Sequence, residues 1–358
     1  MREIFADSYT IYIGDKVLYE FNSILEDFHD KYSKIFIFCD ENSSKFCLPH
    51  LIKLVPMLIG AELIEIEPGE ESKTLPICLD VWKTICESKA DRKSIVINLG
   101  GGVVCDMGGF IASLYNRGLR FFHIPTTLLS QVDASVGGKL GVDLDSYKNQ
   151  IGLFRNPDMV LIDPTFLETL PKRHFLSGFA EVFKHALIAD IDYWKLLIQL
   201  DFDNINNIED ILYHSISIKN KIVHEDWEEK GPRKILNFGH TIGHALESQS
   251  LQKNRGLLHG EAIAIGMAVE TLLSKSKGLL SNEECIEILD TLVEIFTLEK
   301  IDMFEFNDLL KWMQQDKKNF DGQINFTLLS SIGKAEINSN CIVNDIKDAL
   351  NKYNLFLK

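Results

Sequence analysis

Short apolar runs and longer amphipathic stretches alternate along the first 170 residues, and this alternation constrains the fold more than any other feature of the sequence. The short runs are rich in Ile, Phe and Val and occupy residues 10–13, 34–39, 63–66, 94–99, 121–124 and 159–162. Between several of them, at 17–28 and 75–88 for example, apolar residues recur three and four positions apart, which indicates helices. Strands that alternate with helices predict a parallel α/β sheet.

The pattern changes after Asp163-Pro164 and Leu170-Pro171. Helical periodicity then appears in residues 177–189, 208–224, 241–248, 261–277, 283–294 and 306–313. Two short apolar runs, at 323–328 and 334–337, predict one late hairpin. A chain of 358 residues is long enough for two domains. We therefore predict an α/β domain over residues 1–170 and a mainly helical domain over residues 171–358.

Charge and cysteine content narrow the classes of partner. The 37 Lys and Arg residues against 52 Asp and Glu residues give a net charge of −15, which repels phosphate backbones and anionic lipids. We expect neither nucleic acid nor membrane as a partner. An acidic start and the lack of an eighteen-residue apolar run favour a cytoplasmic location. Seven cysteines without a C-x-x-C pair fit reduced thiols, so a bound metal would need other ligands.

A glycine-rich turn follows the strand pattern at residues 94–99. The run Gly100-Gly101-Gly102-Val103-Val104-Cys105-Asp106 lets backbone N–H groups approach a diphosphate at the start of a helix. The G-x-G-x-x-G pattern is incomplete because Cys105 occupies the place of the last glycine. Asp40, at the end of an earlier strand, and Asn42 could bind a ribose, but both could equally cap the next helix. The turn predicts a dinucleotide site.

Histidines and a carboxylate are spaced as metal ligands in the second half. His240 and His244 lie four residues apart on one helical face, and His259 begins another helix. A third helix carries Glu181 and His185, so five residues compete for three or four ligand positions. An isolated histidine pair or an exposed E-x-x-K pair carries little information by itself. Together with the flanking glycines, however, these residues favour a zinc site.

A group of basic residues falls within or near these motifs, although the chain is acidic overall. Cations that converge on one cleft would bind a small polyanion such as a phosphorylated sugar acid. For any single lysine, a solvated surface position is the more common interpretation. The residues of this group are Lys139, Lys148, Arg155, Lys184, Lys219, Arg233, Lys317 and Lys318.

In order along the chain, these motifs resemble the 3-dehydroquinate synthases of the sugar phosphate cyclase superfamily. The resemblance covers most of the chain, from about residue 40 to residue 318. The matching runs include Pro68-Gly69-Glu70-Glu71-Ser72-Lys73, Gly100-Gly101-Gly102-Val103-Val104-Cys105-Asp106, Val132-Asp133-Ala134-Ser135-Val136-Gly137-Gly138-Lys139, Lys148-Asn149, Ser177-Gly178-Phe179-Ala180-Glu181, Asn237-Phe238-Gly239-His240-Thr241-Ile242-Gly243-His244 and Leu258-His259-Gly260-Glu261.

This resemblance implies a Rossmann-like NAD-binding domain, a helical metal-binding domain and an active site in the cleft between them. The zinc ligands would be Glu181, His240 and His259; Co²⁺ could occupy the same donor set. The residues implied to contact NAD are Asp40, Asn42, Glu70, Lys73, Gly102, Val103, Asp106, Thr126, Thr127, Lys139, Lys148, Phe166, Leu167, Glu168 and Thr169. The residues implied to act on substrate are Asp133, Lys139, Asn149, Lys184, Lys219, Arg233, Asn237 and His244, with Arg117 lent across a homodimer interface.

The implied reaction converts 3-deoxy-D-arabino-heptulosonate 7-phosphate into 3-dehydroquinate and phosphate, with transient oxidation by NAD⁺. His244 is the expected proton shuttle because it lies one helical turn from a ligand. His185 is expected in a structural or supporting place, and one of Lys317 and Lys318 should approach the substrate. Four positions differ from the family pattern, namely Cys105, Leu140, Asp143 and Tyr147.

Three alternative functions compete with this interpretation. One of them, a non-catalytic binding protein that kept the fold, is disfavoured because no expected catalytic side chain is missing. Another sugar phosphate cyclase could act on an amino analogue or on a substrate without the carboxylate, and a metal-dependent polyol dehydrogenase could share the architecture. The set of Lys184, Lys219, Arg233 and Asn237 favours the dehydroquinate enzyme, because the groups that bind a carboxylate would have no role in the other cyclases.

Overall fold

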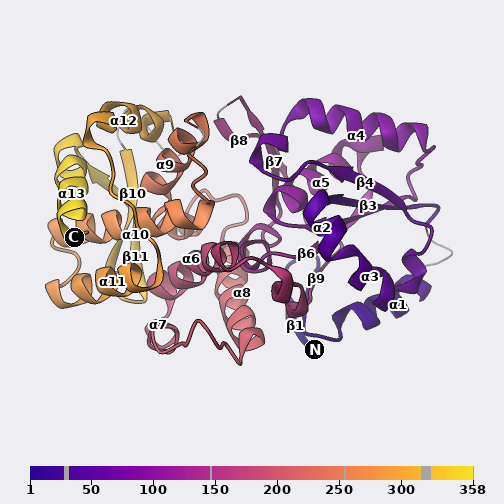
Figure 1. The fold of residues 1–358 in the computed structure, drawn as a ribbon, viewed down its shortest axis with the longest axis horizontal. Helices are drawn as coiled ribbons and strands as arrows, with labels where there is room; N and C mark the ends of the chain where they lie inside the picture. The colour runs from indigo at the N-terminus through magenta and orange to yellow at the C-terminus, as the bar shows by residue number, and fades with distance from the viewer. Residues whose placement is uncertain (28–31, 146, 254, 316–323, 358) are drawn as a thin grey trace. The chain divides into compact units, whose positions relative to one another are not determined.

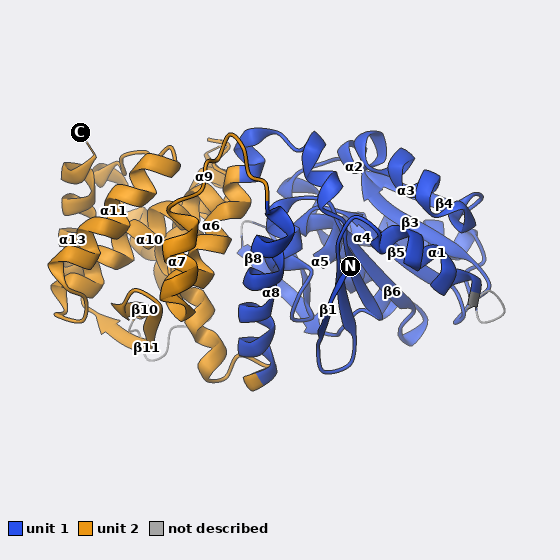
Figure 2. Cartoon of the chain, turned by 90° about the horizontal axis from the view of Figure 1, so that it is seen from below, with its two compact units in different colours: residues 1–175, 207–224 blue, residues 176–206, 225–358 orange. Residues whose placement is uncertain are grey.

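The chain forms two compact units in the computed structural model, which describes residues 1–27, 32–145, 147–253, 255–315 and 324–357. The first unit contains Met1–Phe175 and Asn207–His224, and the second contains Leu176–Asn206 and Glu225–Lys358 (Figure 2). The domain prediction placed a boundary near the first of these breaks but did not assign the segment 207–224 to the first unit. Helical periodicity identifies a helix there, but it does not identify the helix's neighbours.

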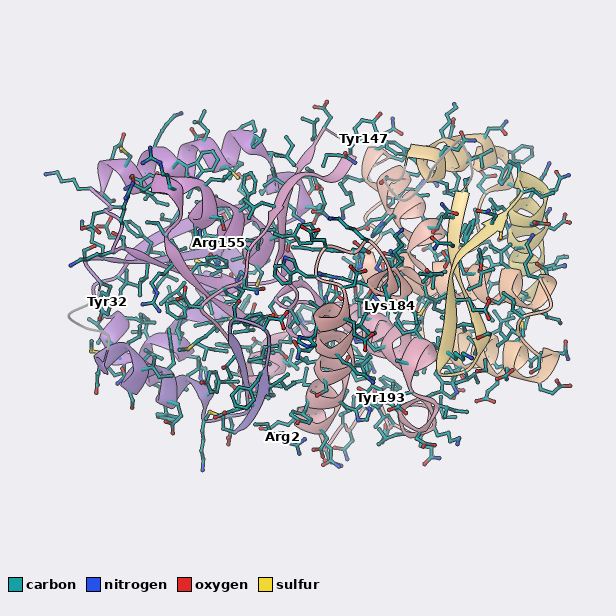
Figure 3. The ribbon with its side chains drawn as sticks, turned by 180° about the vertical axis from the view of Figure 1, so that it is seen from behind. Arg2, Tyr32, Tyr147, Arg155, Lys184 and Tyr193 are labelled. Atoms are coloured by element: carbon teal, nitrogen blue, oxygen red, sulfur yellow. The ribbon has the colours of Figure 1, made fainter. Side chains whose placement is uncertain are left out.

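Helix α8 (Ile208–Glu225) joins the first unit through polar contacts with the N-terminal strand (Figure 3). Arg2 forms an ion pair with Asp210, and the Asn220 side-chain amide donates to the Phe5 carbonyl over 3.1 Å. These partners are more than 200 residues apart in the sequence, so no local pattern could predict their pairing.

A seven-stranded sheet organises the first unit, and every neighbouring pair is parallel except the antiparallel pair β1–β2. In spatial order the strands are β1 (Arg2–Phe5), β2 (Thr10–Ile13), β9 (Met159–Ile162), β6 (Arg120–Pro125), β5 (Ile95–Gly100), β3 (Ile35–Asp40) and β4 (Glu62–Ile66). The predicted parallel α/β sheet is therefore present, with β1 as an added edge strand.

Both faces of this sheet are covered, which explains the nearly continuous apolar character of its central strands. Successive side chains of β3 point to opposite faces. Ile37 packs with helices α1 (Val17–Asp27) and α3 (Leu48–Leu54), whereas Phe36 and Phe38 pack with α4 (Leu75–Glu87) and α5 (Gly102–Leu114). Figure 1 shows these two helix pairs on opposite sides of the strands.

Several shorter elements complete the first unit and carry predicted site residues. An antiparallel hairpin, β7 (Lys139–Leu144) and β8 (Tyr147–Phe154), packs against α5 through Leu140 and Val142. The short helices are α2 (Glu41–Phe46), η2 (Pro56–Leu58), η3 (Glu70–Ser72), η4 (Tyr115–Arg117), η5 (Ser130–Ala134) and η6 (Pro164–Thr169).

The second unit is helical apart from one hairpin, as predicted. Helix α10 (His259–Ser276) packs against α9 (His240–Gln252), α11 (Asn282–Ile295) and α13 (Val343–Phe356). The other elements are α6 (Lys172–Ala189), which begins in the first unit, α7 (Ile191–Leu197), η7 (Pro232–Asn237), η8 (Met303–Glu305) and α12 (Phe306–Gln315). The hairpin consists of β10 (Ile324–Ser331) and β11 (Lys334–Cys341).

Across the described ranges, no helix is both long enough and apolar enough to cross a membrane.

Candidate active site

The glycine-rich turn joins β5 to α5 and leaves the start of that helix open. No side chain caps α5, whose N-cap residue is Gly101. A Cβ atom at Gly101 would lie only 3.3 Å from the Thr127 Cγ2 atom, so the absence of a side chain keeps the backbone accessible. Gly102 and Val103 form the first turn of α5. Exposed N–H groups and the positive end of a helix dipole suit a diphosphate.

Later glycines of α5 allow the helix to lie close to the sheet and the hairpin. A Cβ atom at Gly108 would lie 2.0 Å from Asn98 Oδ1 on β5, and one at Gly109 would lie 2.4 Å from Leu140 Cδ2 on β7. The close helix–strand packing that the last glycine of G-x-G-x-x-G provides is therefore supplied one turn later. Cys105 itself is fully buried.

Lys73 is a buried cation at the centre of a charge cluster beside this turn. Its Nζ atom donates to Asp106 Oδ2 over 2.6 Å and to Asn149 Oδ1 over 2.7 Å. Glu70 forms an ion pair with Lys148, in which Oε1 and Nζ lie 2.9 Å apart. Burial lowers the pKa of Lys73, but the neighbouring carboxylates, Asp106 first, raise it above its ordinary value. The cluster brings together five residues that the sequence predicted for cofactor or substrate, from three separate segments.

Asp143 belongs to the same cluster and was noticed in the sequence only as a departure from the family pattern. Its Oδ1 atom accepts the Asn149 backbone N–H over 2.6 Å, and its own N–H donates to the Lys73 carbonyl over 2.9 Å. Burial and the nearby Glu70 charge raise the pKa of Asp143 to about 6, against the effect of Lys73. Asn149 has a φ of 52°, and this contact therefore stabilises a backbone conformation that residues other than glycine rarely adopt.

Asp40 caps the helix that follows it, which was the simpler of the two interpretations of this residue. Its Oδ1 atom accepts the Ser43 backbone N–H over 2.7 Å, and the Ser43 hydroxyl is 3.0 Å from the Asp40 backbone nitrogen. Asn42 is exposed on α2. A capping carboxylate can still accept a hydroxyl, so the two interpretations are compatible.

Other predicted residues of the first unit lie near strand ends or turns. Thr126 and Thr127 follow β6 directly, while Phe166, Leu167, Glu168 and Thr169 lie in η6, which follows β9. Lys219 on α8 donates to Asp133 Oδ1 over 2.6 Å.

Lys139 is exposed at the start of β7. Arg155, by contrast, donates to the Leu119 carbonyl over 2.8 Å, which gives it a structural role.

Arg117 is exposed in a strained turn after α5. Asn116 and Arg117 have φ values of 53° and 68°, and Gly118 follows them with a φ of 113°. Two consecutive left-handed residues other than glycine are costly and persist where the surroundings require them.

The second unit brings Glu181, His240 and His259 together from three helices, α6, α9 and α10. The Glu181 carboxylate is fully buried. Its Oε1 atom lies 3.6 Å from His240 Nε2 and 3.5 Å from His259 Nε2. One carboxylate oxygen and two imidazole nitrogens are a donor set suited to Zn²⁺ or Co²⁺.

Hydrogen-bond acceptors lie at the other nitrogens of both imidazoles. His240 Nδ1 is 3.1 Å from the Phe238 carbonyl oxygen, and His259 Nδ1 is 3.1 Å from Glu247 Oε2. Burial alone would lower the pKa of His259. Glu247 and Glu181 together outweigh that effect and raise the pKa to about 10. The site therefore favours positive charge, and its donor set fits a divalent cation.

The remaining predicted residues of this unit surround the triad or are held by their own partners. The rings of His240 and His244 have centroids 4.9 Å apart, and Lys184 forms an ion pair with Glu181 on the same helix. Arg233 is buried and donates to the Trp227 carbonyl over 2.6 Å. Asn237 donates to Glu229 Oε1 over 2.8 Å. His185 is fully buried in α6.

Sequence reasoning did not identify Glu247 or Glu270 as part of this centre. Glu247 lies seven residues after His240 on the same helix, so helical spacing could have found it. Glu270 acts on the backbone of another helix, and no local signal points to that contact. Lys317 and Lys318 lie outside the described residues.

Two family models match the chain, one described as 3-dehydroquinate synthase N-terminal over residues 63–177 and one as 3-dehydroquinate synthase C-terminal over residues 178–319. A 3-dehydroquinate synthase of Parabacteroides distasonis is 38% identical over 338 residues, which cover 93% of this chain and 96% of the relative. One from Dictyoglomus turgidum is 37% identical over 346 residues, with 94% of each chain covered.

Two of the solved structures of similar shape are those of related cyclases. A 2-epi-5-epi-valiolone synthase from Streptomyces hygroscopicus with NAD⁺ and Zn²⁺ bound has a TM-score of 0.84 and 27% identity, and covers 99% of this chain and 98% of its own. A 2-deoxy-scyllo-inosose synthase complexed with carbaglucose-6-phosphate, NAD⁺ and Co²⁺ has a TM-score of 0.84 and 25% identity, with 98% and 99% covered.

Proposed function

This chain belongs to the 3-dehydroquinate synthase family, and from that membership we propose that it converts 3-deoxy-D-arabino-heptulosonate 7-phosphate into 3-dehydroquinate and phosphate. It is an enzyme that eliminates phosphate and closes a ring, and it uses NAD with Zn²⁺ or Co²⁺. Its reaction lies in the shikimate pathway, which supplies chorismate and the aromatic amino acids.

One observation supports this function most directly. The three residues that the family resemblance assigned to the metal, Glu181, His240 and His259, come together from three helices around a fully buried carboxylate. When bound, Zn²⁺ lowers the pKa of an alcohol that it contacts, and NAD⁺ supplies a reversible hydride acceptor. The chain itself provides the buried carboxylate and the two imidazoles that would hold the ion.

We assign the residues of the first unit mainly to the cofactor. The open start of α5 at Gly102 and Val103 would bind the diphosphate, and Asp40 and Asn42 a ribose. The charge cluster would complete the site with Glu70, Lys73, Asp106 and Lys148. Thr126, Thr127 and the residues 166–169 lie at the carboxyl ends of parallel strands, where ligands of such sheets bind.

We assign the remaining polar residues to the substrate, a small phosphorylated sugar acid. Lys139, Asn149 and Arg117 would hold its phosphate, whereas Lys219 and Arg233 would bind the carboxylate and ring oxygens. His244 would move protons, because its ring lies beside that of the ligand His240. Lys184, Asn237 and Asp133 complete the set. The use of Arg117 across an interface makes a homodimer part of the proposal, and we place the enzyme in the cytoplasm.

The reaction is tested by measuring phosphate and NADH together, with the heptulosonate phosphate as substrate. We expect phosphate release with catalytic NAD⁺, no net NADH, and loss of activity after treatment with a chelator that Zn²⁺ restores. NADH formed in proportion to substrate, without phosphate, would instead identify a polyol dehydrogenase.

A second candidate is a cyclase for a sugar phosphate without the carboxylate, because the two similar structures described above are enzymes of that broader group. Higher identity to the dehydroquinate synthases and the buried cation Arg233 favour the first assignment. Sedoheptulose 7-phosphate and glucose 6-phosphate, which lack the carboxylate, provide the discriminating assay. We expect phosphate release only from the heptulosonate phosphate.

A further inference from the structure

Helices α9 and α10 each carry one histidine of the metal triad and one buried carboxylate further along. His240 begins α9, and Glu247 follows it after seven residues. His259 begins α10, and Glu270 follows it after eleven residues. Seven and eleven residues correspond to about two and three turns of an α-helix, so each carboxylate lies on the side of its helix that carries the ligand.

Glu247 of α9 acts on the ligand of α10. Its Oε2 atom lies 3.1 Å from His259 Nδ1, while His259 Nε2 faces Glu181 Oε1 over 3.5 Å. A carboxylate at Nδ1 keeps the proton on that nitrogen and leaves the Nε2 lone pair for a metal ion. Only 8% of the Glu247 surface is exposed, so water does not compete strongly for this contact.

Glu270 of α10 acts on the segment of α9 that carries the other ligand. Its fully buried carboxylate accepts the backbone N–H of Gly239 over 2.6 Å and that of Ile242 over 3.2 Å. The N-cap residue of α9 is Gly239, which has no side chain to cap the helix, so Glu270 takes over that function. His240, the first residue of α9, lies between the two N–H groups that Glu270 binds.

The close approach of the two helices makes this contact possible. A Cβ atom at Gly266 of α10 would lie only 1.9 Å from the Gly239 carbonyl oxygen. Gly239 has a φ of 81°, which turns the chain into α9 at this point. Glu270 lies one turn beyond Gly266 and therefore reaches the amide groups at the start of α9.

We propose that Glu247 and Glu270 are positioning residues of the metal centre, each acting on the histidine that the opposite helix carries. The arrangement is reciprocal, because α9 supplies the orienting carboxylate for His259 and α10 fixes the backbone of His240. The inference rests on the proposed function only in requiring a metal ion at the Glu181, His240 and His259 triad.

Zinc affinity of the full-length apoprotein, measured by competition with a chromophoric chelator, tests this proposal. Glu247→Ala should weaken zinc binding about tenfold to hundredfold, the usual effect of losing such a partner. Glu247→Gln should restore binding to within about threefold of wild type, because the amide oxygen still accepts from Nδ1–H. Glu270→Gln, which has one accepting oxygen instead of two, should weaken zinc binding by about tenfold.

Two further variants distinguish a failure of the metal site from a failure of the positioning role. Glu181→Gln should abolish zinc binding; if it binds as wild type does, the metal site in the proposed function is wrong. Glu284→Gln is the matched control. Glu284 lies at the start of α11 and, like Glu270, accepts a backbone N–H from another segment, that of Ile332 over 3.1 Å. We expect it to change stability without changing zinc affinity.

The inference itself fails if Glu181→Gln abolishes binding but Glu247→Ala and Glu270→Gln bind zinc as tightly as Glu284→Gln does. Co²⁺ absorption distinguishes a positioning residue from a ligand, because His244, Glu247 and His259 also lie close enough together to hold an ion. An unchanged Co²⁺ spectrum in Glu247→Gln supports positioning. A spectrum altered as strongly as in the ligand variant His240→Ala would mean that Glu247 binds the metal directly.

Discussion

The Asp143 carboxylate accepts the backbone N–H of Asn149 over 2.6 Å and so links the two strands of the β7–β8 hairpin. Asp143 is buried beside Lys73, whose ammonium holds the Asn149 side chain. Asn149 is thus fixed at both its backbone and its side chain. A residue that we assign to phosphate binding is held in place before any ligand arrives.

The first prediction concerns Asp143→Asn. In the folded chain burial and Glu70 raise the Asp143 pKa to about 6 from 3.8, so the folded state binds more protons than the unfolded state between these values. Stability from this group is therefore present below about pH 4 and is lost as pH rises through about 6. The amide keeps the acceptor without the charge. We expect the variant to gain stability relative to wild type at pH 7.5, and less at pH 5.

Urea unfolding at several pH values measures this difference. Asp145→Asn, an exposed position in the same hairpin, is the control. A stability difference between Asp143→Asn and wild type that stays constant from pH 4.5 to pH 7.5 would contradict the assignment.

The second prediction concerns the pair of Lys73 and Asp106. Lys73→Met leaves the half-buried Asp106 carboxylate without its cation, and we expect a loss of about 3 kcal/mol in the free energy of unfolding, the lower end of the range for buried pairs. Adding Asp106→Asn removes the unpaired charge and should recover part of that loss. The double-mutant cycle is measured by urea unfolding without ligand. Additive effects of the two substitutions would show that the pair is not coupled.

The third prediction concerns Gly108. A Cβ atom there would lie 2.0 Å from Asn98 Oδ1 and 2.8 Å from Phe38 Cδ1, so Gly108→Ala must push α5 away from the sheet. We expect a loss of about 1–3 kcal/mol in stability and weaker NAD⁺ binding, because α5 carries the diphosphate turn. Calorimetry of NAD⁺ binding and thermal unfolding test both statements.

The fourth prediction concerns removal of the metal. A ligand that binds only the folded state stabilises it by about 2.7 kcal/mol at a hundredfold excess over its dissociation constant. We expect the thermal midpoint of the apoprotein to rise when Zn²⁺ is added and to fall again with a chelator. His240→Ala and His259→Ala should lose this response, whereas His50→Ala, in the first unit, should keep it. An equal response in all variants would place the zinc elsewhere.

Most of the fold could be predicted from the sequence because its signals are local. Strand composition identified β3, β5 and β6, and helical periodicity identified α8, α10 and α11. The family resemblance of the motifs around positions 181, 240 and 259 proposed these residues as metal ligands, and the structure brings their side chains together. The β7–β8 hairpin and helix α13 were not predicted. The hairpin strands contain Gly, Asp, Asn and Lys residues, which are uncommon in strands. Helix α13 was missed although its buried residues recur at helical spacing.

The sequence by itself determined the order of strands and helices, the glycine-rich turn and the types of side chain available for chemistry. These follow from side-chain size, backbone preference and periodicity, which act between near neighbours. Only the tertiary structure decided which carboxylate meets which imidazole, that Glu270 caps a helix thirty residues before it, and that α8 joins the first unit. Such contacts depend on close packing between distant segments, and no local pattern encodes the distance between two atoms that folding brings together.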